Sequence, residues 1–395
     1  MTIPGAVPIR VVVDSLGAGG AERSLAEMLP GLRASGFDMR ITTLIRRDKG
    51  FHDEVERGGF PVYVLGSRGR LGRVAELRRH LRMERPALVH TMLFEADIAG
   101  RLAAARTGIP VLSSLVAVAY DPVRFRDPHV RPMRLRAARS IDGWTARRLT
   151  EHFHAVTETV KESAVTVLRV PPHRVTVIHR GRDPVALGEP GPDRRRRIRG
   201  RLGISEDAVV VIAVGRQEYV KGHEHLFEAL APLLREHPRL VALVVGRTGA
   251  HTARLEERQR SLGLGDRVRL LGHRPDVPDL LAASDVFAFP SLYEGFGGSA
   301  LEAMALGLPV ICSDLPTLRG LVEADRTALV VPPGSPGPLR AALERLLTDA
   351  ELRRRLGGRG RRVFLERFTL ARSVEGMAAL YGRLTGVPRP REVVG

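Results

Sequence analysis

Short apolar runs alternate with helical patterns along most of the chain, and this alternation restricts the fold more than any other feature of the sequence. Runs such as residues 9–13, 208–215 and 286–289 have the length of a buried strand and are too short for a helix. A glycine turn and then apolar residues at helical spacing follow each run. Strand, turn and helix repeated in this order predict the α/β class, with strands in parallel, doubly wound sheets.

The length of the chain predicts two domains, because its 395 residues are too many for one core of ordinary size. Residues 188–199 are rich in proline, glycine and arginine, which is typical of a linker or of the start of a helix. We therefore expect an N-terminal domain over residues 1–187, a C-terminal domain over residues 200–370, and a final helix over residues 371–388.

The strong positive charge does not by itself indicate a nucleic-acid-binding protein. The net charge is +18, yet the chain has only three lysines and no asparagine, which is the codon bias of a GC-rich genome. The densest basic run, residues 194–199, has no aromatic residues between its arginines to stack on bases. No secretory leader is recognisable and no apolar run reaches ~18 residues, so we expect a cytoplasmic protein. The single cysteine, Cys312, excludes an internal disulfide.

One stretch, residues 286–312, combines a strand end, a glycine loop and the start of a helix. Pro290 ends the strand because proline cannot donate to the sheet, and Gly297 and Gly298 allow the backbone to approach a ligand closely. Ser299 is a suitable N-cap for the helix that follows. The free N–H groups and the dipole of that helix point out of the sheet, so we expect an anion there, with a phosphate as the first candidate.

Two glutamates flank this turn, Glu294 and Glu302, with seven residues between them. The stretch resembles the Glu-x7-Glu element of retaining GT-B glycosyltransferases of family 4, which use nucleoside-diphosphate sugars. The resemblance implies that Glu302 bonds the ribose hydroxyls of the donor and that Glu294 is catalytic. The donor-binding residues from this loop and helix would be Phe296, Gly297, Gly298, Ser299 and Glu302. The alternative is that both carboxylates only stabilise the helix dipole, by a few tenths of a kcal/mol each.

A second loop, which follows the run at 208–215, supplies cations. A leaving nucleoside diphosphate gains negative charge, and fixed positive groups at the end of a strand lower that barrier. Arg216 and Lys221 match the diphosphate-binding arginine and lysine of the family, which implies that both are catalytic and that Gly215 borders the donor. His273 and Arg274 match the turn that passes beside the nucleobase. The alternative for Lys221 is a solvated loop residue.

The N-terminal half resembles the family more loosely. Gly19 and Gly20 belong to a Gly-Gly-Ala-Glu turn that borders the donor phosphates in the family, although such a turn is at least as often a tight connection. His90 ends a strand, and we expect a packed, hydrogen-bonded residue rather than a catalyst. Val116 stands near the place of a family histidine that faces the transferred sugar. Arg180 replaces an asparagine of the segment that leaves the first domain.

Together these matches imply the GT-B fold, with two facing Rossmann-like domains and an interdomain cleft. The first domain would lie on the acceptor side, the second would bind the nucleotide sugar, and the final helix would cross back to the first. The implied enzyme is a retaining hexosyltransferase of cell-surface glycan, glycolipid or natural-product biosynthesis. Its diphosphate leaves on the face that the acceptor hydroxyl attacks, and a diphosphate oxygen takes the proton.

Several properties of this enzyme stay open at the level of sequence. We expect no cofactor and no metal, because no Asp-x-Asp follows a strand and no His/Asp set is clustered. UDP is favoured over GDP only as the commoner donor among such enzymes. A phosphorylase or nucleotide-sugar epimerase of the same fold is one alternative. An arginine-rich nucleic-acid-binding protein is an alternative of another class.

A basic segment of the first domain suggests where the acceptor comes from. Six arginines lie close together here: Arg124, Arg126, Arg131, Arg134, Arg136 and Arg139. With Met133, Leu135 and Trp144 nearby, one prediction is peripheral contact with an anionic membrane at its inner face, or a lipid-linked or phosphorylated acceptor. The other is a solvated basic helix and a small soluble acceptor, such as a natural-product aglycone.

Overall fold

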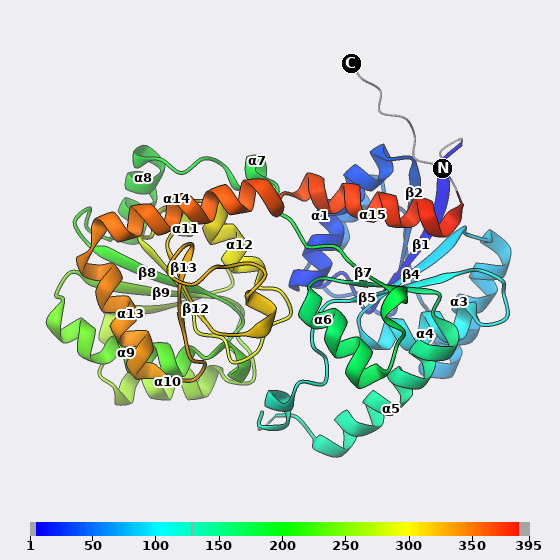
Figure 1. The fold of residues 1–395 in the computed structure, drawn as a ribbon, viewed down its shortest axis with the longest axis horizontal. Helices are drawn as coiled ribbons and strands as arrows, with labels where there is room; N and C mark the ends of the chain where they lie inside the picture. The colour runs from blue at the N-terminus through cyan, green and yellow to red at the C-terminus, as the bar shows by residue number, and fades with distance from the viewer. Residues whose placement is uncertain (1–4, 128, 387–395) are drawn as a thin grey trace. The chain divides into compact units, whose positions relative to one another are not determined.

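The computed structural model describes residues 5–127 and 129–386, which form two compact units (Figure 1). Each unit is built around one parallel sheet, so the expected α/β class is confirmed. Among the described residues, unit 1 contains 5–120, 131–181 and 370–386, and unit 2 contains 121–127, 129–130 and 182–369.

The sheet of unit 1 has seven parallel strands in the order β3-β2-β1-β4-β5-β6-β7. The strands are β1 (Val7–Val13), β2 (Phe37–Thr43), β3 (Val62–Val64), β4 (Leu88–Met92), β5 (Val111–Leu115), β6 (His152–Ala155) and β7 (Val175–Val177). The strand order reverses between β1 and β4, which is where open α/β sheets bind ligands at their carboxyl edge.

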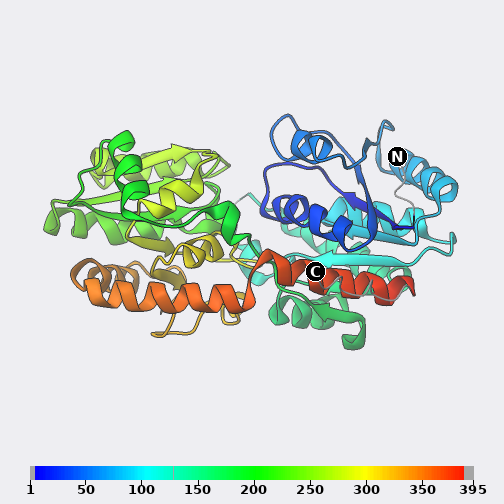
Figure 2. The same cartoon turned by 90° about the horizontal axis from the view of Figure 1, so that it is seen from above.

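Helices cover both faces of this sheet, because successive residues of β1 point to opposite faces and all of them except Arg10 are apolar. Val11 and Val13 pack in one core with α1 (Gly20–Ala34) and α15 (Leu370–Thr385), which lie side by side (Figures 1 and 2). Val12 packs in the other core with α3 (Arg70–Glu84) and α4 (Phe94–Ala104). The remaining helices of the unit are α2 (His52–Arg57), α5 (Pro132–Leu149), which packs on α4, and α6 (Glu158–Ser163).

The sheet of unit 2 has six parallel strands in the order β10-β9-β8-β11-β12-β13. The strands are β8 (Val209–Val214), β9 (Leu240–Val245), β10 (Val268–Gly272), β11 (Val286–Phe289), β12 (Val310–Ser313) and β13 (Ala328–Val331). The order reverses between β8 and β11, and both predicted donor loops follow these two strands.

Two layers of helices cover the sheet of unit 2. One core joins the sheet to α9 (His223–Glu236), α10 (Thr252–Ser261) and α13 (Pro336–Thr348). The other layer contains α8 (Pro192–Leu202), α11 (Val277–Ala282), α12 (Gly298–Ala305) and α14 (Ala350–Arg367), which contact one another in succession. A short helix, α7 (Pro184–Leu187), precedes α8.

The basic run at 194–199 is part of α8, so the start of a helix is the reading that the structure supports. Arg199 is fully buried, donates to the carbonyl oxygens of Ala208 and Ala283, and bonds Asp285 at 2.7 Å. The structure divides the units between residues 181 and 182, ahead of the expected linker at 188–199. The arginines of α8 therefore fasten this helix to the sheet of unit 2.

Candidate functional site in unit 2

The loops after β8 and β11 emerge side by side, because these two strands are parallel neighbours in the sheet. The first loop runs from Gly215 to the start of α9, and the second runs from Pro290 to the start of α12. The loops after β9 and β10 leave the same edge of the sheet. Every donor-site residue that the sequence predicts in unit 2 therefore lies at one edge or on the first turns behind it.

Lys221 and Glu294 are brought together although 73 residues separate them. Lys221 ends a 3-10 turn (Tyr219–Lys221), and its Nζ is hydrogen-bonded to Glu294 Oε1. Ser291 Oγ donates to the same carboxylate oxygen at 3.0 Å. The ammonium also lies 5.8 Å from the centre of the Phe289 ring. Lys221 thus contacts Glu294 and the Phe289 ring at the end of β11, and Ser291 holds the Glu294 carboxylate.

Arg216 stands apart from this pair. Its Nη1 lies 3.7 Å from Glu218 Oε1, and its side chain is exposed. Gly215 lies directly behind Lys221, since a Cβ there would come within 3.3 Å of Lys221 Cδ. Gly215 is covered on another side by Gly246, where a Cβ would meet Gly215 O at 1.8 Å. The backbone at the end of β8 is therefore fixed, whereas the Arg216 guanidinium extends into solvent.

The start of α12 differs from the expected cap. Gly297, not Ser299, is the N-cap residue, and it has the left-handed φ of 87° that favours glycine. Ser299 lies in the first turn, and its Oγ donates to Val214 O at 3.0 Å, which ties α12 to the end of β8. Phe296 is buried and packs edge-on against Phe368. Gly298 begins the helix, and the guanidinium of Arg182 lies beside it.

Glu302 is buried in α12 and forms an ion pair that the sequence did not predict. Arg182 Nε donates to Glu302 Oε1 at 3.0 Å, and the two side chains are 3% and 4% exposed. Arg182 Nη2 lies 2.9 Å from the position of a Cβ on Gly298, so the guanidinium reaches the N-terminal end of α12. The only signal in the sequence was an arginine at the valine position of the family's exit segment. A cation at the positive end of a helix favours an anion nearby.

His223 is a further buried side chain behind the first loop. It begins α9, and its Nε2 would be 3.7 Å from a Cβ on Gly215. Burial lowers the pKa of His223 to about 4, so its ring is neutral at pH 7. It therefore supports the end of β8 without adding a charge to the site.

His273 and Arg274 follow β10, two strands away from β8. Arg274 is held by Asp276 through two bonds of 2.8 and 2.6 Å, and the Asp276 carboxylate raises the pKa of the arginine. His273 is exposed. Gly246 N donates to Gly272 O at 2.8 Å, which joins the loops after β9 and β10. The turn that the resemblance assigns to the nucleobase is thus at the predicted edge of the sheet. The Arg274 side chain is held there by Asp276, and the His273 side chain is exposed.

Gly19 and Gly20 lie in unit 1, at the N-terminal end of α1. Gly19 is the N-cap residue, and the Glu22 carboxylate folds back over it. Asp14 directly follows β1, next to this turn, and accepts a hydrogen bond from Ala96 N at 2.7 Å. Burial raises the pKa of Asp14 to about 6. This turn is at the switch point of the first sheet.

His90 belongs to a buried chain of hydrogen bonds, so the expectation of a packed residue is confirmed. His154 Nε2 donates to Ile178 O at 2.9 Å, and its Nδ1 accepts from Ser114 Oγ at 2.8 Å. Ser114 in turn accepts from His90 Nε2 at 2.6 Å, and His90 Nδ1 accepts from the Tyr381 hydroxyl at 2.7 Å. Burial lowers the pKa of His90 to about 3 and that of His154 to about 4, so both rings are neutral.

The basic segment of the sequence is divided between the two units. Arg124 and Arg126 belong to unit 2, whereas Arg131 and the arginines of α5 belong to unit 1. Leu135 is buried, but Met133 and Trp144 are exposed on α5. No helix in the described ranges is long and apolar enough to cross a membrane. The basic surface to consider is therefore α5 with its neighbours in unit 1.

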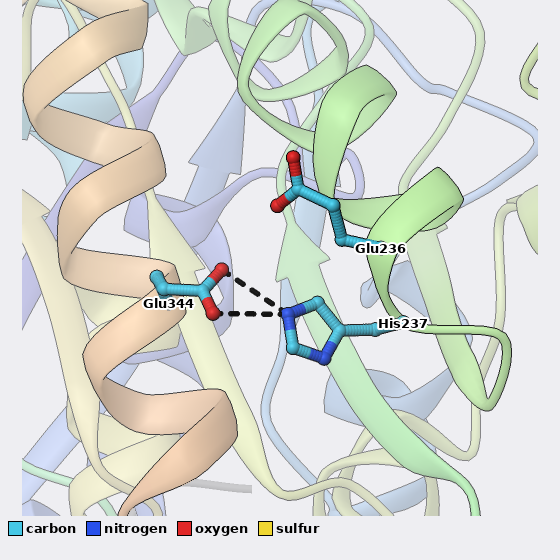
Figure 3. Close-up of side chains that lie close together, drawn as sticks. All are labelled: Glu236, His237 and Glu344. Carbon is cyan, nitrogen blue, oxygen red and sulfur yellow. Dashed lines mark hydrogen bonds and ion pairs between the residues drawn. The ribbon is translucent and has the colours of Figure 1, made fainter.

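Figure 3 shows the one group within the described residues whose side chains lie close enough to share a metal ion: Glu236, His237 and Glu344. His237 Nε2 contacts the two Glu344 oxygens at 3.0 and 3.1 Å, and Glu236 pairs with Arg340 at 2.8 Å. Glu236 ends α9, His237 follows it before β9, and Glu344 lies on α13. The group is therefore at the amino edge of the sheet. The donor loops leave the opposite edge, so this group is separate from them.

The arrangement in unit 2 can bind and stabilise a polyanion. It offers the ammonium of Lys221, the guanidinium groups of Arg216 and Arg182, and the N–H groups at the start of α12. Two carboxylates, Glu294 and Glu302, orient two of these cations. Such a set is suited to a diphosphate whose charge grows as a bond to it breaks.

Two family models match the chain. One, described as "Glycosyl transferase 4-like domain", matches residues 19–181, and the other, "Glycosyl transferases group 1", matches residues 194–363. Among curated proteins, a D-inositol 3-phosphate glycosyltransferase of Streptomyces bingchenggensis is 31% identical over 325 residues, which is 78% of this chain and 69% of the relative. The chain spans 66–69% of the length of three such relatives.

Other similarities extend over more of the chain. The alpha-D-kanosaminyltransferase of Streptomyces kanamyceticus is 27% identical over 332 residues, which is 82% of this chain and 84% of that protein. Among solved structures, Anabaena Alr3699/HepE in complex with UDP and glucose superposes with a TM-score of 0.84 and 22% identity, covering 95% of this chain and 100% of that one. This last similarity concerns the fold.

Proposed function

Because the chain belongs to the group 1 glycosyltransferases, we propose that it moves a sugar from a nucleoside-diphosphate sugar to an acceptor hydroxyl, with retention at the anomeric carbon. The same assignment disfavours a nucleic-acid-binding protein, an alternative that was supported only by the positive net charge. In this proposal residues of unit 2 bind the donor, and residues of unit 1 bind the acceptor.

The observation that carries the proposal is the pairing of Lys221 with Glu294 between the loops after β8 and β11. This lysine lies at the switch point of the sheet, next to a helix N-terminus, and pairs with a carboxylate. Such a lysine is suited to stabilise the negative charge that develops on a leaving diphosphate. A solvated loop lysine is not expected to pair with a carboxylate that a neighbouring hydroxyl also holds, nor to lie over an aromatic ring. This geometry favours the functional reading of Lys221 over the solvated one.

The chemistry follows from where charge develops. The bond between the anomeric carbon and the diphosphate oxygen breaks, and the acceptor oxygen bonds to that carbon on the same face. The acceptor proton passes to a diphosphate oxygen, so no protein base is required. Lys221, Arg216 and the N–H groups of α12 stabilise the departing diphosphate, and Glu302 holds the ribose. Arg182 keeps the Glu302 carboxylate in position.

We propose that the nucleotide of the donor is UDP. The support is that Anabaena Alr3699/HepE, which shares the fold, was solved with UDP. Isothermal titration of the full chain with UDP, GDP, UDP-glucose and GDP-mannose tests this choice. Binding of UDP at least tenfold tighter than GDP is expected, and the reverse order would make the enzyme a GDP-sugar transferase.

The acceptor is best sought among polar, phosphorylated or lipid-linked alcohols and small aglycones. One relative is named for an inositol phosphate, so an inositol phosphate belongs in the panel beside small aglycones. Mass spectrometry of reactions with the preferred donor identifies the product. A sugar product that forms only when an acceptor is present supports transfer. Isomerisation of the donor without an acceptor would indicate an epimerase instead.

We propose that turnover needs no metal ion, because cations of the chain already surround the diphosphate position. Turnover should be unchanged by an excess of EDTA. If EDTA abolishes turnover and magnesium restores it, the metal is part of the mechanism. A His237→Ala/Glu344→Ala variant then tells whether the group in Figure 3 is the site that was stripped.

We also propose a cytoplasmic enzyme with peripheral contact to the inner face of a membrane, made by α5. This helix exposes Arg134, Arg136, Arg139, Arg147 and Arg148. Its one acid, Asp142, is buried against Arg101. Co-sedimentation with anionic vesicles at low and at physiological ionic strength tests the contact. An Arg134→Glu/Arg139→Glu variant should stay in the supernatant at both ionic strengths.

A further inference from the structure

Unit 1 contains an open apolar cavity that the proposed transfer reaction does not use. Its volume is about 200 Å³, and its lining residues come mainly from α3 and α4, with one residue of α5. Figure 1 shows where these three helices lie in unit 1. The walls include Val74 of α3, Phe94, Ile98 and Leu102 of α4, and Ile141 of α5. Apolar cavities of about 150 Å³ are large enough to bind a benzene molecule. This one can take a short length of hydrocarbon chain.

Large apolar side chains stand exposed around the opening of the cavity. Leu71 lines it and is 85% exposed, and Ile141 lines it from α5 and is also exposed. Trp144 follows Ile141 by three residues on α5, which places it on the same face of that helix, and it is 53% exposed. Contiguous exposed apolar groups of this kind mark an interaction surface rather than ordinary solvent-facing residues.

The charge around the cavity is positive. Arg70 and Arg73 of α3 line it, and the only acid in its lining, Glu95, is already bonded to Arg70 at 2.6 Å. The Nε of Arg73 is buried and has no hydrogen-bond partner among the described residues. The acids of α3 are engaged as well, Glu76 by backbone N–H groups and Glu84 by Arg10. An anionic group is the complement of this rim.

We infer that this cavity binds one alkyl chain of an anionic phospholipid, with the phosphate of the headgroup at Arg73 and the rim of Leu71, Ile141 and Trp144 set into the membrane. The inference rests on the proposed peripheral contact of α5, and it adds a defined chain site beside that helix. Apolar walls bury the chain, and the guanidinium of Arg73, which is half-buried, donates to a phosphate oxygen. A partner protein would be expected to bring acids and a shaped side chain, whereas an open groove with a basic rim matches an amphiphile of simple form.

Trp144 gives a direct reading of this contact, because it is the only tryptophan of the chain. Vesicles of phosphatidylglycerol are titrated into the full-length protein, and the emission of Trp144 is followed. A blue shift with phosphatidylglycerol is expected, with quenching when the acyl chains carry bromine. Phosphatidylcholine vesicles should bind at least tenfold more weakly. Absence of a shift with phosphatidylglycerol at low salt would overturn the inference.

Variants separate the cavity from the general basic surface. Leu71→Asp and Arg73→Gln should each weaken binding to phosphatidylglycerol at least tenfold. Their matched controls lie on the same helix outside the cavity: Met83→Asp, at a side chain that is 67% exposed, and Arg79→Gln. These controls should bind within about twofold of the parent protein. Equal losses in variants and controls would show that charge and apolarity anywhere on α3 suffice, which overturns the site.

A filled cavity tests whether the chain enters at all. Ala99 is buried in the wall, and Ala99→Phe should occupy the space without changing the surface. Weakened vesicle binding with unchanged circular dichroism supports chain entry. Parental binding by this variant shows that lipid rests on the surface only, and overturns the inference. If Ala99→Phe does not fold, Leu71→Asp decides alone, since its side chain is at the surface.

The same variants distinguish this site from the donor site. UDP binding should be unchanged in Leu71→Asp and Arg73→Gln, because both residues lie in unit 1 and the UDP-binding loops lie in unit 2. Loss of vesicle binding with intact UDP binding is a result about the lipid site alone. A parent protein that binds vesicles but no nucleotide sugar would instead contradict the proposed transfer reaction.

Discussion

Lys221 is the residue on which the proposed chemistry depends most. Replacement by alanine removes a preorganised charge from a place where negative charge grows, which typically costs on the order of 10²–10³ in rate. Lys221→Ala should fold as the parent protein does and lose about this factor in kcat, measured with the preferred donor. Lys161→Ala is the matched control, because that lysine lies in unit 1 and its ion pair among the described residues is with Glu158. Parental turnover by Lys221→Ala would remove the residue from the mechanism.

Arg182 and Glu302 form a pair whose role in stability can be separated from its role in binding. Removing one partner leaves a buried charge uncompensated, which typically costs about 3–5 kcal/mol in the free energy of unfolding. Arg182→Met should lose stability of this order, and Arg182→Met/Glu302→Gln should regain most of it. Donor affinity should stay low in both, because Glu302 no longer holds the ribose. Chemical denaturation and UDP titration measure the two quantities.

The control for this pair is an exposed one in the same unit. Arg326 bonds Glu323 at 2.6 Å, three residues away on the surface. Arg326→Met should cost less than about 1 kcal/mol, because surface pairs contribute little. If Arg182→Met costs no more than this, the buried pair does not position Glu302.

The chain of hydrogen bonds through His90 and His154 makes stability depend on pH. In the folded protein His154 stays neutral down to a pH of about 4 and His90 down to about 3, whereas in the unfolded chain both take up protons near pH 6.5. The unfolded state therefore binds more protons below pH 6.5, and stability falls as the pH is lowered from 6.5 toward 4. A His90→Gln/His154→Gln variant should lose less stability between pH 7 and pH 5 than the parent protein does.

Denaturation curves at the two pH values give this difference directly. The control is His173→Gln, since His173 is exposed and lies outside the chain of bonds. A slope with pH that is the same in all three proteins would mean that the buried histidines are not the groups that take up protons.

At the scale of elements, the start of α12 depends on one glycine. Gly297 has a φ of 87°, and a Cβ there would lie 2.9 Å from Leu318 Cδ2 and 3.3 Å from Phe289 Cε1. Gly297→Ala should therefore lower the free energy of unfolding by about 1–3 kcal/mol and weaken donor binding. Gly200→Ala in α8 is the control, since nothing lies within 4 Å of its Cβ position. That substitution should be neutral or stabilising by up to about 1 kcal/mol.

Much of this architecture could be predicted from the sequence, because it follows from local rules. Apolar runs followed by glycine turns predicted the strands. The loops after β8 and β11 follow the two strands for which the sequence predicted them. The cap of α12 could not be predicted in detail. Ser299 is the better cap by residue type, but Gly297 has the backbone conformation that the turn requires, and the hydroxyl of Ser299 bonds Val214 O instead.

Long-range pairs are what the sequence could not supply. Arg182 and Glu302 are 120 residues apart, and no local sequence pattern predicts their ion pair.

Tertiary packing also decides the course of α9, which runs unbroken from His223 to Glu236 although Pro232 lies inside it. Its apolar face, with Leu226, Leu230 and Leu233, is fully buried, and this packing outweighs the local cost of the proline.

At the scale of the whole molecule, donor binding should stabilise one unit selectively. A ligand that binds only the folded state of unit 2 protects the segments it orders. Hydrogen exchange with saturating UDP should slow in peptides over residues 215–223 and 290–302. The core strands of unit 1 should exchange as they do without UDP, which serves as the internal control. Protection confined to unit 1 would contradict the assignment of the donor site.

The division of the chain between the units has a consequence for its biosynthesis. Unit 1 includes α15, which is synthesised only after all of unit 2, and Tyr381 of α15 ends the buried chain of bonds that starts at Ile178. While the ribosome is still making residues 182–369, the first sheet has strands and α1 but lacks the helix beside α1. The first unit to begin is thus the last to be completed, and a nascent chain released near residue 187 would expose the apolar face that α15 covers.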